Sequence, residues 1–507
     1  MLAFEHLPSE LYEFVFMYLK SNDILVSFMN LNKRFTKLVH YQICRKVDVS
    51  LSKSDFHDIL HYVQSTMQSI KLNDNQLNKV FPTTITSYPN LRSIILNNIP
   101  HVNGKYSVHI ESFKTLYSLT LNFLFQCETP EIDQHVLFNK CSLEKLFITN
   151  CVLSLDSSNS IQMCQSIKYL TIKIQYQHHL FMLMENFPSL VYLNIQITKG
   201  IKSTDSYDYI NGKLLPLNLK QFILDSSVKR IQYDHLEYLL SKQFKLEYLS
   251  INIRINHLID GRRLEYGLLS KLSKLKQFNF HIHCYHSYVS PNIMSTFQSK
   301  YWLQHPMMYY HNSNANLHTL ASLPFIYDYM MVSNGISEYQ SNIQCNLMVP
   351  NVKYLVLYNA TEPSTLKLCH FLKTIVSKNA YGLLLYGPCR FDDDMMNDTS
   401  VTLSTITMLQ LGFDNGEYRY IKRLLLLTPN VRKLHIKQEL LLNIKEQLRD
   451  DHELRELICQ NITQLTMFQR NQNGLINNIN SNEIRIIFPN AAIVSEHRDQ
   501  QREECRN

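Results

Sequence analysis

One arrangement of apolar and polar positions recurs along most of this chain. It reads apolar, two variable residues, apolar, one variable residue, apolar. The clearest copies begin at Leu91, Leu143, Ile167, Leu190 and Leu246. Others begin at Leu116, Leu219, Leu275, Val352, Ile406, Val431 and Ile462, and weaker ones at Cys44, Met67, Ala380 and Ala491. Successive copies mostly lie 23 to 31 residues apart, and each short apolar alternation predicts one β-strand.

Prolines divide these copies from what precedes them. A proline stands two residues ahead of the first apolar position in YPNL, FPSL, VPNV, TPNV and FPNA, where it ends a helix and directs the chain into a strand. Apolar residues at helical spacing lie upstream, as at Leu180, Leu183, Met184 and Phe187 or at Leu366, Phe371, Leu372 and Ile375. Each copy therefore predicts a strand, a loop, a helix and a turn, and right-handed crossovers make consecutive strands parallel.

Repetition of this unit predicts an α/β fold in which the strands stack into one curved, right-handed solenoid, with parallel strands on the concave face and helices outside. About sixteen strands at roughly 4.8 Å would give a sheet about 75 Å long. The pattern lapses between Leu275 and Val352. The region at about 283–350 therefore predicts a hairpin-like insert or degenerate repeats, in which LHTLAS reads as a damaged copy.

The variable positions of each strand alternate onto the concave face. Tyrosine takes the first of these positions four times, at Tyr169, Tyr192, Tyr248 and Tyr354. Tyrosine provides a large contact area at small entropic cost and carries a polar end, so these four residues are candidates for binding a target protein. The alternative is that they stabilise the sheet through cross-strand contacts.

The first forty residues have a different pattern, which predicts three short helices. The first begins near Pro8, ends before Ser21, and is apolar nearly all round from Leu11 to Leu19. The second contains Ile24 and Leu25, and the third contains Phe35. Three helices of this size cannot bury so much apolar surface, so residues such as Phe14 or Phe16 are expected to contact a partner.

The start of this segment resembles an F-box, the module by which substrate receptors dock onto the Skp adaptor of cullin-type ubiquitin ligases. The resemblance rests on Leu7-Pro8-x-Glu10, on apolar spacing through three helices and on Arg34-Phe35, where Phe35 occupies a position that is Trp in many F-boxes. With the repeats, the chain resembles the leucine-rich-repeat family of F-box proteins. The adaptor-binding residues that this implies are Leu7, Pro8, Glu10, Leu11, Phe14, Leu19, Ile24 and Leu25.

The resemblance implies an F-box at residues 1–42 and a repeat solenoid at 43–507. It further implies a non-catalytic substrate-recognition subunit, bound to a Skp-type adaptor and through it to cullin, which presents an unidentified target protein for ubiquitination. An alternative is a repeat scaffold in which the N-terminal helices only cap the array.

Composition adds limits to this picture. With 45% hydrophobic and 18% charged residues, the chain is expected to fold. It has no apolar run of transmembrane length and no basic segment ahead of an apolar core at its start, so we expect a cytoplasmic or nuclear protein without a membrane partner. Eleven scattered cysteines without a CxxC pair predict reduced, buried thiols, and a diffuse net charge of +7 gives no support for nucleic-acid binding.

No combination of residues in the sequence predicts catalysis or a cofactor. The strongest metal-like cluster is His281, His283, Cys284 and His286, but histidine is also common on strands, and a zinc site needs three or four convergent ligands. Asp392, Asp393, Asp394 and Asp398 lack the spacing of a calcium loop and predict a solvated loop or helix start. GxGxxG, GxxxxGK[ST] and GxSxG are all absent, so we expect no catalytic, cofactor or metal residues.

Overall fold

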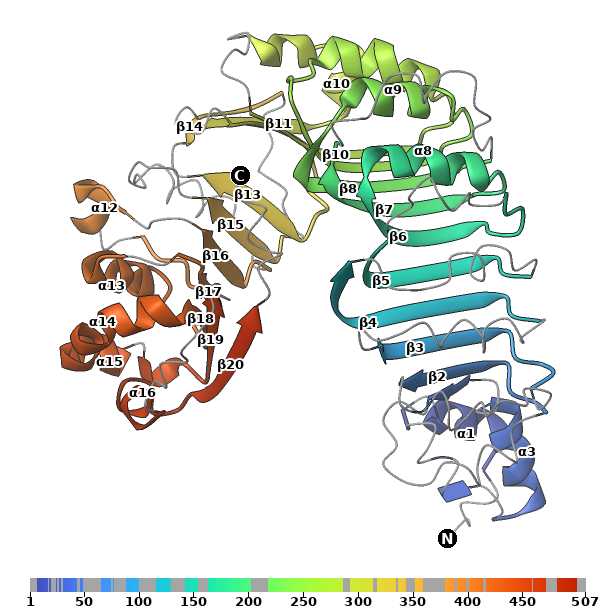
Figure 1. The fold of residues 1–507 in the computed structure, drawn as a ribbon, viewed down its shortest axis with the longest axis horizontal. Helices are drawn as coiled ribbons and strands as arrows, with labels where there is room; N and C mark the ends of the chain where they lie inside the picture. The colour runs from blue at the N-terminus through green and yellow to red at the C-terminus, as the bar shows by residue number, and fades with distance from the viewer. Residues whose placement is uncertain are drawn as a thin grey trace. The chain divides into compact units, whose positions relative to one another are not determined.

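The computed structural model describes much of the chain in two compact units (Figure 1). The described residues are 7–16, 18–19, 24, 27–28, 31–42, 46–48, 65–73, 76, 88–99, 115–128, 142–153, 163–201, 218–285, 292–312, 317–333, 336–342, 352–358, 379–386, 390–397, 401–413, 416–457, 459–470 and 481–498. Unit 1 consists of Met1–Ser250 and Leu268–Gln277, and unit 2 of Ile251–Gly267 and Phe278–Asn507. The predicted division between residues 42 and 43 does not coincide with a unit boundary and stays a prediction.

The fold is a mixed α/β fold with two sheets, the larger of which is mostly parallel. Thirteen strands form this sheet in the order β1-β2-β3-β4-β5-β6-β7-β8-β9-β10-β12-β11-β14. Their bounds are β1 Lys46–Asp48, β2 Ser69–Asn73, β3 Ser93–Ile99, β4 Ser118–Glu128, β5 Lys145–Leu153, β6 Tyr169–Tyr176, β7 Tyr192–Gly200, β8 Gln221–Ile231, β9 Tyr248–Ile255, β10 Gln277–Tyr285, β11 Met307–Asn312, β12 Leu317–Ser322 and β14 Ile336–Ser341. From β1 to β8 each strand pairs in parallel with the next.

The second sheet has seven strands, which are all parallel, in the order β13-β15-β16-β17-β18-β19-β20. Their bounds are β13 Tyr329–Ser333, β15 Tyr354–Tyr358, β16 Gly382–Tyr386, β17 Met408–Leu411, β18 Lys433–Lys437, β19 Gln464–Arg470 and β20 Ala492–Arg498. The α/β class with parallel strands is thus confirmed, whereas the expectation of one continuous array of strands is wrong because hydrogen bonding divides the strands into two sheets.

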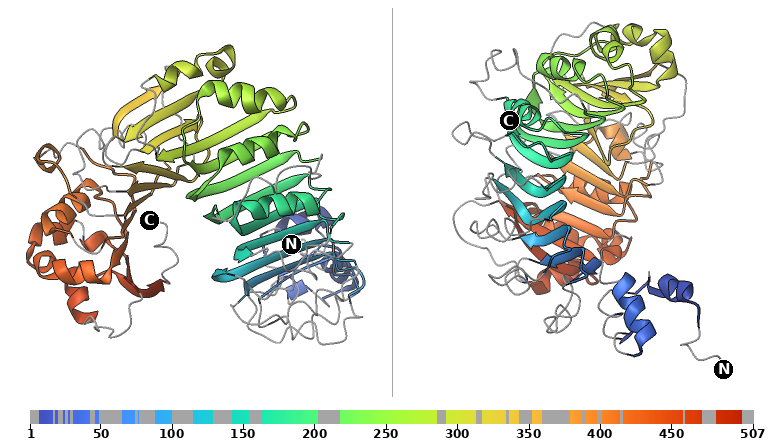
Figure 2. Two further views of the ribbon diagram at one scale, coloured as in Figure 1. Left: turned by 45° about the horizontal axis from the view of Figure 1, so that its top comes forward. Right: turned by 90° about the vertical axis from the view of Figure 1, so that its right-hand side faces the viewer.

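The described helices are short, and from α8 onward they lie between consecutive strands. In unit 1 they are α1 Ser9–Phe16, α3 Lys33–Gln42, α8 Gln177–Asn186, α9 Tyr233–Ser241 and the 3-10 turn η4 Leu269–Lys271. The element η3, Arg263–Leu268, includes residues of both units. In unit 2 they are η5 Ile293–Phe297, α10 Lys300–Gln304, α12 Asp393–Asn397, α13 Tyr418–Leu427, α14 Gln438–Asp450, α15 His452–Leu457, η6 Cys459–Asn461 and α16 Ser481–Ile487. Figures 1 and 2 show α13 to α16 on one side of the seven-stranded sheet. No described helix has the length and hydropathy to cross a bilayer.

The repeat pattern locates the strands closely. Fifteen of the sixteen copies are followed by a strand that begins two residues after the first apolar position, and the copy at Ala491 is followed by one that begins at Ala492. The apolar positions of the five clearest copies are buried, and equivalent residues pair across the sheet, as Leu146 with Leu170 and Leu170 with Leu193. The pattern therefore sets both the strand positions and their register.

A recurring backbone contact explains this register. The residue just after the first apolar position uses one carbonyl to accept the N–H groups of two consecutive residues of the next copy. The Arg92 carbonyl, for example, accepts from Tyr117 and Ser118 at 2.8 and 2.9 Å, and the Thr407 carbonyl accepts from Arg432 and Lys433 at 2.8 and 3.0 Å. Because a carbonyl has two lone pairs, one atom aligns each copy with the next.

Asparagines provide a second contact between copies that the sequence pattern did not reveal. The residue after the proline in YPNL, TPNV and FPNA reaches back to the preceding copy. The Nδ2 atoms of Asn90, Asn430 and Asn490 donate to the carbonyls of Ser65, Ser404 and Gln460 at 2.6, 2.7 and 2.9 Å. All three acceptors lie two residues ahead of the first apolar position of their own copy, so these bonds repeat along the chain.

The structure reveals one further copy of the repeat pattern, and it shows that one segment expected to be a copy is not one. Residues 327–332, YDYMMV, have the pattern with Tyr327 in the first apolar position, and they lead into β13, which pairs with β15 in the same register as the other copies. LHTLAS is not a damaged copy, because it forms β12, which pairs antiparallel with both β10 and β11. The expected hairpin is present in β11 and β12, and tyrosine in place of an aliphatic residue concealed the copy at Tyr327.

The single tryptophan of the chain lies at the centre of this region. Trp302 is fully buried on α10, and its Nε1 donates to the Gly261 carbonyl at 3.0 Å. Phe280 and Phe297 pack against it with ring centroids 6.0 and 4.8 Å away. Trp302 is therefore a core residue of unit 2 and is not a surface contact for a partner.

Candidate interaction surfaces

The N-terminal helices enclose an aromatic core. The rings of Tyr12 and Phe35 meet edge to face at 4.8 Å, and Phe28 lies 5.2 Å from Phe16 and 5.6 Å from Phe35. Tyr12, Phe16 and Phe35 are at most 6% exposed. Phe35 therefore fills the centre of this small module.

Two polar side chains fix α1 against α3. Asn32 caps α3, since its Oδ1 accepts from the backbone N–H groups of Arg34 and Phe35, both at 2.9 Å. The Arg34 guanidinium donates to the Leu7 carbonyl at 2.5 Å and lies 5.6 Å from the centre of the Tyr12 ring. The first turn of α1 is thereby held beside the start of α3.

The module also exposes apolar side chains, which we call the N-terminal apolar face. Its members are Leu11, Phe14, Val15, Tyr18, Leu19 and Leu31, with exposed fractions of 48, 54, 37, 76, 40 and 59%. Figure 1 shows α1 and α3 next to the β2 end of the unit 1 strands. Phe14 is available to a partner as expected. Phe16 is not, because it is 6% exposed in the module core.

The residues implied as adaptor-binding fall into three groups. Leu11, Phe14 and Leu19 belong to the N-terminal apolar face, while Pro8 and Glu10 are exposed beside it and Leu7 is half-buried. Ile24 is 2% exposed and therefore contributes to the module's own core. Leu25 lies outside the described residues. The first helix ends at Phe16, earlier than expected, and Tyr18 and Leu19 follow in turns closed by i to i−3 hydrogen bonds.

Three of the four predicted target-binding tyrosines lie in unit 1, and all three are half-buried on the sheet. Tyr169 and Tyr192 are directly paired neighbours with ring centroids 6.4 Å apart, whereas Gln221 pairs with Tyr192 on the side of β8. The Lys145 ammonium lies 5.2 Å from the Tyr117 ring and 5.1 Å from the Tyr169 ring. Part of this tyrosine surface is thus already occupied by a cation of the chain itself.

The fourth tyrosine, Tyr354, belongs to a larger group in unit 2. Its ring stacks on Tyr329 at 4.8 Å and meets Tyr381 edge to face at 5.0 Å, and the Tyr354 and Tyr381 hydroxyls share a hydrogen bond of 2.6 Å. This bond, together with burial, raises the pKa of Tyr354 to about 12. Tyr354 packs against the buried side chains of Val356 and Leu384, which lie on the sheet face opposite to the main core of unit 2.

We call Tyr329, Tyr354, Tyr381, Tyr386 and Met408 the tyrosine patch. Tyr329 and Tyr381 are 50 and 38% exposed, and the other three are half-buried. Only Tyr354 could be predicted from the sequence. It alone among the tyrosines of the patch lies two residues after the first apolar residue of a recognised copy. Tyr381 lies one residue earlier, Tyr329 belongs to the unrecognised copy, and Tyr386 lies at the far end of its strand.

Glycine makes room for the patch. A Cβ on Gly382 would overlap the Tyr354 ring, and one on Gly412 would lie 2.9 Å from Cδ1 of Tyr386. The Tyr354 ring thus lies across Gly382 of the neighbouring strand, and the Tyr386 ring lies across Gly412, which follows the end of β17. Neither glycine has a positive φ, so the requirement is space for the ring and not backbone conformation.

We expect Gly382→Ala to destabilise unit 2 by about 1–3 kcal/mol, because the added methyl group displaces the Tyr354 ring. Chemical denaturation followed by circular dichroism measures the effect. The matched control is the same change in a Tyr354→Ala background, where the methyl group has room and the cost should nearly disappear. Equal costs in both backgrounds would contradict the proposed overlap.

The histidines considered as metal ligands are structural. His281 and His283 are fully buried, with Nδ1 atoms 3.1 Å from Asn252 Oδ1 and 2.9 Å from Thr319 Oγ1. Burial lowers the pKa of His281 to about 3 and that of His283 well below its usual value, so both are neutral at pH 7. His286 lies outside the described residues. Among those described, no three His, Cys, Asp or Glu side chains are placed to hold a metal ion.

The acidic cluster and the cysteines are the other residues considered as candidates. Asp393 and Asp394 form the first turn of α12, which agrees with the expected helix start, and Asp398 lies outside the described residues. Four cysteines whose side chains the structure describes, Cys151, Cys164, Cys284 and Cys459, are free and buried, as expected for reduced thiols.

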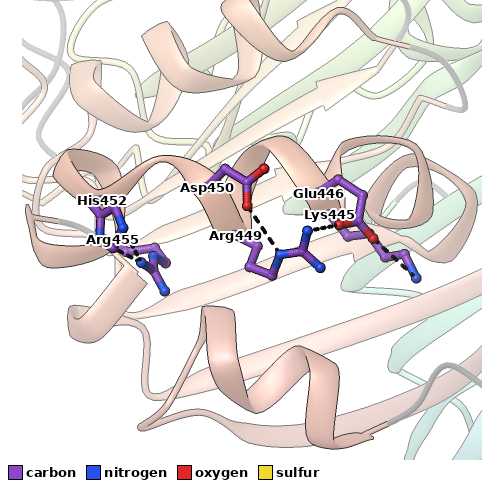
Figure 3. Close-up of polar contacts among 6 residues, drawn as sticks. All are labelled: Lys445, Glu446, Arg449, Asp450, His452 and Arg455. Atoms are coloured by element: carbon purple, nitrogen blue, oxygen red, sulfur yellow. Dashed lines mark hydrogen bonds and ion pairs between the residues drawn. The ribbon is translucent and has the colours of Figure 1, made fainter.

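A charged network covers α14 and α15. Figure 3 shows Arg449 between Glu446 and Asp450, and Arg455 beside His452. The Arg455 guanidinium lies 2.7 Å from His452 Nδ1. Between the two helices, Asp451 caps α15 through the Leu454 N–H at 3.0 Å. Its Oδ2 lies 2.7 Å from both the Tyr418 hydroxyl and the Lys422 ammonium. Burial alone would raise the pKa of Asp451, but these hydrogen bonds outweigh it and lower the pKa to about 2.

We expect Asp451→Asn to destabilise unit 2 by roughly 1–2 kcal/mol at pH 7. Because the folded pKa is lowered, the carboxylate stabilises the fold above its unfolded pKa of 3.8 and loses this effect as the pH falls through about 2. The difference in unfolding free energy between wild type and variant should therefore stay constant above pH 5 and fall to about half by pH 3. Asparagine still caps α15, and the buried histidines affect both proteins equally. A difference independent of pH would contradict this account.

Comparison with known proteins does not assign the chain to a family. No protein-family model matches it, and no curated protein is similar to it.

Proposed function

We propose that this protein is a substrate-recognition subunit of a Skp-cullin-F-box ubiquitin ligase. In this proposal, the N-terminal apolar face docks on a Skp-type adaptor, and the repeats form a right-handed leucine-rich-repeat solenoid that presents a target protein. The protein supplies no acid, base or nucleophile. It acts in the cytosol or nucleus by holding a target lysine close to a ubiquitin-charged enzyme, which raises the effective concentration of the reacting groups.

The observation that carries the proposal is the N-terminal apolar face. Six large apolar side chains are exposed on a module of a few dozen residues, although other aromatic side chains of the module form a buried core. Leu11, Phe14 and Val15 share one face of α1, and the Tyr18 ring packs on Phe14 with centroids 5.3 Å apart. Exposed apolar side chains grouped in this way are typical of a site that a partner covers. The Leu7-Pro8-x-Glu10 start and the buried Phe35 agree with the F-box resemblance.

The solenoid part of the proposal is supported by the repeat itself. Copies 23 to 31 residues apart give parallel strands whose equivalent residues pair, and the bifurcated carbonyl contact recurs in both units. This is the expected behaviour of repeats in which each copy contacts its neighbours.

A second candidate function is a repeat scaffold in which the N-terminal helices cap the array. It is favoured by the clustering of these helices with the strands of unit 1 in one compact unit. Deletion of residues 1–42 separates the two: the cap requires an unfolded remainder, whereas a docking module leaves a folded remainder that no longer binds adaptor.

The direct test is co-purification of the full chain with a Skp-type adaptor. We expect a stoichiometric complex, and we expect the triple variant Leu7→Ala/Pro8→Ala/Leu11→Ala to lose it. A well-folded protein that does not associate with the adaptor would contradict the proposal.

A further inference from the structure

The tyrosine patch borders a row of residues, each of which comes directly before a strand of the seven-stranded sheet. This row ends in a basic site. The row begins at Asp328 and Lys353, which form an ion pair of 3.0 Å, and so neutralise each other. Tyr381 and Thr407 follow at equivalent positions of the next copies, and Arg432 takes the same position in the copy after that. The side chain of Tyr381 reaches the patch from this position, which shows that the row borders it.

Arg432 and Lys433 form the basic end of this row, and we call them the basic pair. Both are exposed, and within the described residues neither makes an ion pair. Lys433 pairs in register with Met408 of the tyrosine patch, and His435, half-buried, follows on the same side of β18. The positive charge is therefore adjacent to the apolar surface.

From β13 to β19 no acidic residue takes a strand position on this face, whereas Glu496 takes one on β20, in register with Phe468 of β19. From β13 to β19, the strand positions that share a side with Tyr354 and Lys433 are Tyr, Met, Ser, Val, Gly, Leu, Gln, Lys, His, Thr, Phe and Arg residues. A surface that is aromatic at the tyrosine patch and positively charged at the basic pair complements a ligand that carries an apolar group and negative charge.

We propose that the tyrosine patch and the basic pair together bind an extended acidic peptide segment of a partner protein. An aromatic or aliphatic side chain of the segment rests on Tyr329, Tyr354 and Tyr381, and its carboxylates contact Arg432 and Lys433. This inference names the class of target in the proposed function and rests on that function for its biological meaning.

The strand spacing determines the layout of the segment. From Tyr354 on β15 to Lys433 on β18 there are three strand steps, or about 14 Å at roughly 4.8 Å per step. An extended chain rises about 3.3 Å per residue, so the apolar anchor should precede or follow the acidic cluster by about four residues. A segment shorter than this reaches only one of the two sites.

The test is fluorescence anisotropy with the purified full chain and a labelled peptide that carries a Leu-Tyr anchor, four Gly or Ser residues and three glutamates. Two comparison peptides replace the glutamates by glutamine or the anchor by serine. We expect each replacement to weaken binding about tenfold, and the glutamate peptide to lose affinity as ionic strength rises.

Protein variants locate the site. Arg432→Glu/Lys433→Glu should weaken binding of the glutamate peptide by about tenfold or more without affecting the glutamine peptide, and Tyr329→Ala should weaken both. The matched controls are Lys271→Glu/Lys274→Glu, exposed lysines of unit 1, and Tyr266→Ala, which is 67% exposed. Neither control should change the affinity.

Two results would overturn the proposal. One is equal binding of the glutamate and glutamine peptides to the wild-type protein. The other is a dimer in sedimentation that Tyr329→Ala dissociates, which would assign the patch to a second copy of the chain. Adaptor binding involves the N-terminal apolar face, so it is measured separately, and failure of one proposal is distinguishable from failure of the other.

Discussion

Replacement of Leu11 and Phe14 by aspartate should reduce adaptor binding at least about a hundredfold and leave the chain folded. Both side chains are about half exposed on the N-terminal apolar face, so the unbound protein loses little when they become polar. In a complex, the same positions would place two carboxylates in a desolvated apolar contact, where unpaired charge is costly. Isothermal titration with a Skp-type adaptor measures the change.

Two matched variants make this result interpretable. Leu303→Asp changes an apolar residue of unit 2 that is 51% exposed, and it should leave adaptor binding unchanged. Phe35→Ala removes a ring from the module core, and it should lower both the stability of the module and its affinity. Full adaptor binding by the Leu11→Asp/Phe14→Asp protein would contradict the assignment of this face.

Trp302→Ala should be the most destabilising single substitution discussed here, at about 3–5 kcal/mol. The side chain is fully buried, it contacts Phe280 and Phe297, and its indole N–H satisfies the Gly261 carbonyl. Truncation leaves a cavity and a buried carbonyl without its partner. Because Trp302 is the only tryptophan, wild-type unfolding can be followed by fluorescence, while the variant requires circular dichroism.

Trp302→Phe separates the two causes. It keeps most of the volume and loses the hydrogen bond, so we expect a cost clearly below that of alanine, on the order of 1–2 kcal/mol. Adaptor binding should persist in both variants where the protein remains folded, since Trp302 lies in unit 2. A cost under 1 kcal/mol for Trp302→Ala would contradict its place in the core.

The strands could be predicted closely because two independent constraints coincide in the sequence. The apolar positions must be buried, and each copy must present the same backbone groups to the next, so a copy such as Leu190–Ile195 determines both where β7 lies and what it pairs with. The copy at Tyr327 was missed because a half-buried tyrosine takes the first apolar position, and its hydroxyl donates to the Ile251 carbonyl at 2.9 Å.

The surfaces were less predictable, because exposure depends on packing that no local pattern determines. Phe14 and Phe16 are equivalent in the sequence of α1, yet one is 54% exposed and the other is 6% exposed, because Phe28 covers only the second. The tyrosine patch likewise depends on Gly382, which leaves space for the ring of a tyrosine on the neighbouring strand. A pattern within one copy cannot reveal a contact between two copies.

The bifurcated carbonyl contact also bears on how the chain can change in length. Since alignment of each copy on the next depends on one carbonyl at the start of the strand, it does not depend on the number of residues between strands. Spacings from 23 to 31 residues are accommodated in the same register. Loops between strands can therefore lengthen or shorten without moving the surface residues, which allows new contacts to evolve at the strand ends while the sheet stays as it is.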